Sequence, residues 1–124
     1  MKILAVSIKS LLILSALFVF QSFLVSDGVV GTWKYQATNT APEYASGEII
    51  IDKSEDDFMV TLSVNYSKIK GNSVVVEDNQ VKFNINVEGA DVDVLLNFDG
   101  DNFTGEAQSD EGTYALKGKR KSMK

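Results

Sequence analysis

From Val29 onward the chain is dominated by a strict alternation of apolar and polar residues. Every second residue from Val81 to Val87 is apolar, while the residues between them are Lys, Asn and Asn, followed by Glu88. The segment from Val92 to Phe98 repeats the pattern, with Leu95 as its one exception. A period of two places successive side chains on opposite faces of a strand. The alternation therefore predicts an all-β chain whose strands each have one apolar face.

Turn residues interrupt the alternation at short intervals, at Gly89-Ala90, Asp99–Asn102 and Ser109–Gly112. Eight strands are predicted, over residues 29–38, 46–52, 57–65, 67–76, 80–88, 91–98, 102–109 and 112–121. The fourth has the weakest pattern, because Gly71-Asn72 either divides it or marks a bulge. Short links between sequential strands favour an eight-stranded antiparallel up-and-down meander barrel, which leaves no exposed sheet edge. A two-sheet β-sandwich is the alternative.

The first 26 residues have a different character. Lys2 and Lys9 flank the start of an apolar run from Leu11 to Phe20 that continues, with interruptions, to Val25. A basic segment followed by an apolar segment of about 10 residues is typical of a secretory signal. The run is shorter than the roughly 20 residues that span a bilayer as a helix.

We therefore expect residues 1–26 to be a signal peptide that is cleaved after Ser26, with retention as an N-terminal anchor as the alternative. In both cases residues 27–124 form a single exported β-barrel domain, periplasmic or secreted. Contact with a membrane is expected only through an uncleaved signal segment.

Composition and charge narrow the classes of function. The absence of His and Cys excludes disulfides, thiol nucleophiles and His-based acid–base chemistry, so no enzyme, no cofactor and no metal site is expected. All 17 acidic residues precede residue 117, against seven lysines, whereas the last eight residues hold five basic ones. An acidic body argues against nucleic acid as a partner. The basic end is either a solvated tail or a patch that meets an anionic surface.

Clustered carboxylates suggest two further functions, glycoside hydrolysis and calcium binding. Asp91 and Asp93, like Asp99 and Asp101, lie in turns or on outward strand positions where water reaches both groups. Nothing there distinguishes a general acid from a base, as glycoside hydrolysis requires. The Asp99–Asn102 turn also lacks the ligand spacing of an EF-hand.

Two short features resemble a known superfamily. Gly31-Thr32-Trp33 opens the first predicted strand, and Arg120 lies in the last. This arrangement resembles the calycins, which include lipocalins, fatty-acid-binding proteins and avidins. The resemblance implies that Trp33 packs under Arg120 and, with Gly31, closes one end of the barrel. A single Trp argues against the avidin biotin site, and residues 41–47 resemble those of small exported bacterial lipocalin-like proteins of unassigned function.

Barrel parity also predicts the interior. An eight-stranded barrel is either filled by its side chains or holds one small ligand. Small inward residues on the first and last two strands are expected to leave space: Gly31, Ala37, Gly105, Ala107 and Gly118. The candidate ligand contacts in the interior and at the rim are Tyr35, Phe58, Phe83, Phe98, Phe103 and Tyr114.

We therefore predict a non-enzymatic, lipocalin-like module that binds a small apolar molecule at the end opposite Trp33 and Arg120. The alternative is a filled-core barrel that acts as an inhibitor, or as an interaction module with a protein partner in the cell envelope.

Overall fold

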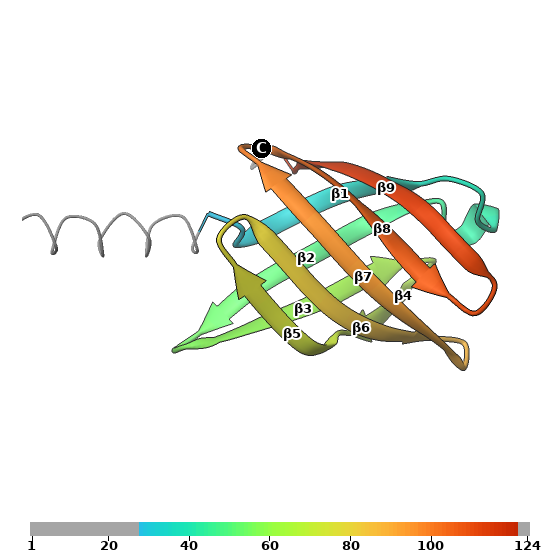
Figure 1. Cartoon of the computed structure of the whole chain (residues 1–124), viewed down its shortest axis with the longest axis horizontal. Helices are drawn as coiled ribbons and strands as arrows, with labels where there is room; N and C mark the ends of the chain where they lie inside the picture. Colours follow the sequence, from blue (N-terminus) through green and yellow to red (C-terminus); the bar gives the residue numbers. More distant parts are fainter. Residues whose placement is uncertain (1–27, 122–124) are drawn as a thin grey trace, which may run out of the picture.

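The computed structural model describes residues 28–121, which form one continuous antiparallel sheet of nine strands curled into a nearly closed barrel (Figure 1). The elements are β1 (Gly31–Ala37), η1 (Pro42–Tyr44), β2 (Ser46–Ser54), β3 (Asp57–Val64), β4 (Ser67–Lys70), β5 (Asn72–Glu77), β6 (Gln80–Val87), β7 (Ala90–Asp99), β8 (Asn102–Ser109) and β9 (Gly112–Arg120). The predicted signal or anchor segment lies outside the described residues. Over the described range, no helix has the length and apolar character needed to cross a membrane.

The first and last strands pair with each other, which turns a meander into a barrel. β1 and β9 are antiparallel neighbours, with Trp33 opposite Arg120 and Ala37 opposite Leu116. Figure 1 shows these two strands side by side, joining the two halves of the sheet. The predicted up-and-down barrel is confirmed, and the two-sheet sandwich is wrong because all strands belong to one sheet.

The predicted strand count of eight is wrong, because the segment predicted over 67–76 forms two strands. β4 pairs with β3, whereas β5 pairs with β6, so the segment supplies both edges of the sheet in turn. The change occurs at Gly71, whose backbone N–H donates to the carbonyl of Val60 at 2.8 Å. A Cβ at Gly71 would lie 3.2 Å from the Phe83 ring, so a residue without a side chain fits best between the two edges.

The ladder between β5 and β6 is irregular where it begins. Its register shifts between Asn72 and Val75, and Ser73 has a positive φ of 53°. Such an irregularity is a β-bulge, which bends a strand and increases its local twist. The bulge lies where the chain leaves β3 and joins β6, and β4 and β5 do not pair, so the barrel is only nearly closed at this point.

Burial follows the predicted parity. On β6, for example, Val81 and Phe83 are buried while Lys82 between them is exposed. The buried core consists of residues assigned to the inward face: Val29, Trp33, Tyr35, Ile49, Ile51, Val60, Leu62, Val64, Val81, Phe83, Ile85, Val94, Leu96, Phe98, Phe103 and Leu116. Among the described residues, the only polar side-chain groups in this set are the Tyr35 hydroxyl and the Trp33 indole N–H. The barrel is therefore held by burial of a single apolar face.

Candidate functional site

One end of the barrel is filled by aromatic rings. Trp33 is completely buried, and its indole Nε1–H donates to the carbonyl of Val29 at 3.0 Å. The rings of Phe98 and Phe103 meet the Trp33 ring edge-on, with centroids 4.6 and 6.0 Å away. Edge-to-face contacts of this kind are favourable for aromatic quadrupoles. These three rings occupy the interior at this end.

Arg120 covers the same end from β9. Its guanidinium carbon lies 4.3 Å from the centroid of the Trp33 ring, a distance at which cation–π attraction operates. Nη1 donates to the carbonyl of Val30 at 2.8 Å and Nη2 to that of Gly28 at 2.7 Å. Nε donates to Asp101 at 3.0 Å, in an ion pair. The guanidinium thus ties the segment preceding β1 to the β7–β8 turn.

Three of the small inward residues make room for neighbouring groups and not for a ligand. A Cβ on Gly31 would come within 2.6 Å of the Arg120 guanidinium, and Gly31 also has a positive φ of 146°. A Cβ on Gly118 would collide with the Phe103 ring, and one on Gly105 would collide with the backbone of β7. The expectation that these glycines leave free space is therefore wrong.

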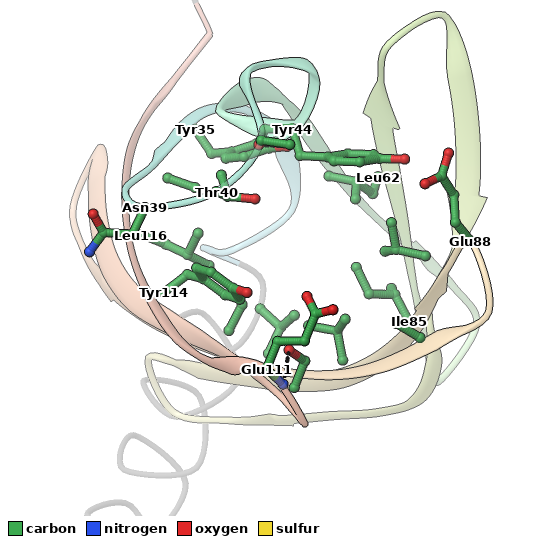
Figure 2. A pocket seen from close by; sticks show the side chains of 18 of the residues that line it. Tyr35, Asn39, Thr40, Tyr44, Leu62, Ile85, Glu88, Glu111, Tyr114 and Leu116 are labelled. Atoms are coloured by element: carbon green, nitrogen blue, oxygen red, sulfur yellow. Dashed lines mark hydrogen bonds between the residues drawn. The ribbon is translucent and has the colours of Figure 1, made fainter.

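The opposite end holds a cavity of about 500 Å³ that opens to solvent (Figure 2). Its lining comprises Tyr35, Ala37, Asn39, Thr40, Ala41, Tyr44, Ile49, Leu62, Phe83, Ile85, Val87, Glu88, Ala90, Val92, Val94, Ala107, Ser109, Glu111, Tyr114 and Leu116. Strand residues form an apolar wall, and polar residues from three connections form the mouth. This size and this distribution of polar groups are those of a small-molecule site.

The structure divides the candidate ligand contacts between the two ends. Tyr35, Phe83 and Tyr114 line the cavity, as do the small residues Ala37 and Ala107. Phe98 and Phe103 instead pack on Trp33 at the filled end, and Phe58 lies outside the lining, near the start of β3. Strand parity correctly predicts that these side chains face inward but carries no information on their height along the barrel.

The connection from β1 to β2 contributes mouth residues that sequence reasoning missed. It contains η1, and Asn39, Thr40, Ala41 and Tyr44 from this segment all line the cavity. The Tyr35 hydroxyl donates to the backbone carbonyl of Tyr44 at 2.9 Å and so fixes the loop over one side of the mouth. One sequence feature could have indicated these mouth residues, because this connection, the longest in the predicted barrel, contains the single Pro of the chain and an aromatic residue.

Both tyrosines that join this loop to the barrel stay neutral at physiological pH. Burial, and to a smaller degree the neighbouring Tyr44, raises the pKa of Tyr35 to about 12. The pKa of Tyr44 is also raised, by desolvation first and then by its hydrogen bond to Glu88 and the negative charges of Glu88 and Glu43. Figure 2 shows the Tyr44 hydroxyl directed across the mouth toward Glu88.

Over residues 28–121 no three His, Cys, Asp or Glu side chains come together in a way that could hold a metal ion. Asp101, in the acidic turn considered for calcium, is paired with Arg120. The site that remains is an apolar cavity closed at one end by Trp33 and rimmed by polar groups at the other.

Fold and site together define a small antiparallel up-and-down β-barrel with an apolar cavity that opens at one end. No protein-family model and no curated protein matches the sequence. Among solved structures the chain is similar to the crystal structure of a point mutant of the fluorescent protein UnaG. The TM-score is 0.51 at 10% identity, and the match covers 77% of this chain and 98% of that one. At this identity the likeness concerns the fold alone.

Proposed function

We propose that this chain is an exported, non-enzymatic module that binds one small apolar molecule in the open end of its barrel. The observation that carries the proposal is the cavity of about 500 Å³, because natural ligand sites measure roughly 300–1,000 Å³ and are mainly apolar. The filled end supports it, since Trp33 and Arg120 hold the barrel together without using the space at the mouth.

Displacement of a neutral fluorescent probe tests the binding proposal. Phenylnaphthylamine is apolar and uncharged near neutral pH, and its emission rises when it leaves water. The barrel domain is expected to bind it and to release it to a competing aliphatic alcohol such as decanol. Ala107→Phe, which adds a ring to the cavity lining, is expected to abolish probe binding.

The matched control is Ala115→Phe, because Ala115 is exposed on β9 and lies outside the lining. This variant is expected to bind the probe as the parent does. A folded parent domain that binds no apolar probe would overturn the proposal. Its function would then lie on the outer surface, as in the alternative of an envelope interaction module.

Export is proposed from the pattern of residues 1–26. Expression of the full chain, followed by fractionation and intact-mass measurement, is expected to give an exported product that begins at Asp27. An exported product that keeps Met1 would indicate the anchor alternative. Leu14→Arg, which interrupts the apolar run, is expected to leave the chain in the cytoplasm. An intracellular, full-length parent chain would refute export.

A further inference from the structure

The mouth of the cavity has a charge of one sign. Glu88, in the β6–β7 turn, and Glu111, in the β8–β9 turn, are the charged members of the lining, and both are acidic. Figure 2 shows the two side chains at separate points of the rim, with the Glu111 carboxylate directed toward the opening. No Lys or Arg of the described residues contributes to the lining.

The basic residues nearest in sequence to the cavity strands lie on other surfaces. Lys34 on β1 and Lys117 on β9 are exposed, at positions that alternate with the inward residues of the same strands. Arg120 is at the filled end, where each of its three guanidinium nitrogens donates a hydrogen bond, to Asp101 or to one of two carbonyls. A carboxylate head group in this mouth would therefore meet two like charges and no guanidinium or ammonium.

A cationic head group would meet favourable partners at the same place. Besides the two carboxylates, the rings of Tyr44 and Tyr114 line the mouth, and aromatic faces attract ammonium groups. Farther in, the wall is formed by residues such as Ile85, Leu62 and Val94, which can cover an aliphatic or aromatic body. Polar groups at the mouth and apolar groups below them match an amphiphile that enters with its head outward.

We infer that the cavity selects an amphiphilic amine, an apolar body with one ammonium head group, over the carboxylate anion of the same size. This inference rests on the proposed function and specifies its ligand class. Because Glu88 and Glu111 are exposed, solvent and salt screen them. The expected discrimination is correspondingly about tenfold in Kd, as for a small number of exposed charge pairs.

Three probes with the same aliphatic chain isolate the head group: decylamine and decanoate, each below its micellar concentration, and decanol below its solubility limit. Their competition against phenylnaphthylamine is measured near neutral pH at low ionic strength. Decylamine is expected to bind about tenfold more tightly than decanoate, with decanol between them. The ratio is expected to shrink in about 1 M salt, where the Debye length falls to about 3 Å.

Variants assign the discrimination to the mouth. Glu88→Gln combined with Glu111→Gln is expected to bring the ratio of the amine and carboxylate Kd values close to one. Glu106→Gln is the control for a lost surface carboxylate, because Glu106 is exposed on the outer face of β8; it removes one negative charge, whereas the double variant removes two. This control is expected to keep most of the parent ratio. In Ala107→Phe, decylamine binding is expected to be lost with that of the probe.

The outcomes separate the two proposals. Equal affinities for the three probes, or a preference for decanoate, would overturn the inference of charge selectivity and leave cavity binding intact. Decylamine that still binds Ala107→Phe would reveal attraction to the acidic surface and would also overturn it. Failure of the parent domain to bind phenylnaphthylamine and decanol would contradict the proposed function itself.

Discussion

Replacing Trp33 by Ala tests whether the filled end holds the barrel together. The indole is completely buried, its N–H donates to the Val29 carbonyl, and its ring touches Phe98, Phe103 and Arg120. Truncating a buried Trp or Phe to Ala generally costs about 3–5 kcal/mol, because burial is lost and a cavity remains. The ring contacts on three sides put the expected loss in the upper part of this range.

The free energy of unfolding is measured by urea titration followed by far-UV circular dichroism, since the substitution removes the only Trp. A domain of this size has a stability of about 5–15 kcal/mol, so Trp33→Ala can leave a marginal or unfolded chain. Trp33→Phe provides a second measurement. It keeps a ring but leaves the Val29 carbonyl without its donor, which costs about 1–3 kcal/mol.

Tyr66→Ala is the matched control, because Tyr66 is a fully exposed aromatic residue in the β3–β4 turn. Its effect is expected to lie within about 0.5 kcal/mol of zero. If Trp33→Ala lowered the stability by less than about 1 kcal/mol, the indole would not be a structural plug. The roles assigned above to the two ends of the barrel would then be wrong.

Three further predictions concern the same framework. Arg120→Ala is expected to lower the free energy of unfolding, measured by urea titration, by about 2 kcal/mol, because the charged hydrogen bonds are lost. Its control, Lys121→Ala, breaks a partly exposed ion pair and is expected to lower it by less than about 1 kcal/mol. Equal effects would contradict the role of the guanidinium. Gly71→Val is expected to destabilise the domain by about 1–3 kcal/mol through crowding against Phe83, which a thermal melt detects as a drop of about 4–8 °C per kcal/mol. An unchanged Tm would show that the passage between β4 and β5 has room for a side chain. Because the pKa of Tyr35 is raised from 10.0 to about 12 on folding, the unfolded state loses this proton first, so stability is expected to fall as pH rises from 10 to 12. In Tyr35→Phe, the free energy of unfolding measured by urea titration is expected to change less between pH 10 and 12. A slope equal to the parent's would refute the assignment of this pH dependence to Tyr35.

Much of the fold could be predicted from local sequence, because the alternation of apolar and polar residues is visible within each strand. The alternation around Val81 and Phe83 decides which side chains face inward, and burial in the structure agrees with it. The division at Gly71 depends instead on which neighbouring strands the segment over 67–76 must pair with to complete the barrel. At that residue the chain must approach Val60 on β3 and Phe83 on β6, and neither neighbour is close in sequence.

The cavity was harder to predict than the core, since it depends on the summed volumes of side chains from many strands. Ala37 and Ala107 leave space because no large neighbour fills it, whereas the space at Gly118 is taken by Phe103. Local sequence cannot distinguish these cases. Both kinds of position look alike as small residues with inward parity.

The height of a residue along the barrel nevertheless follows from strand direction, which an up-and-down meander reverses at every turn. Trp33 stands near the start of β1, so the end of β7 and the start of β8 lie at the same level, which places Phe98 and Phe103 beside it. The same reversal places the β1–β2 connection and the β6–β7 and β8–β9 turns at the opposite end. Glu88 and Glu111 belong to those turns, so direction together with parity assigns both acidic side chains to the mouth.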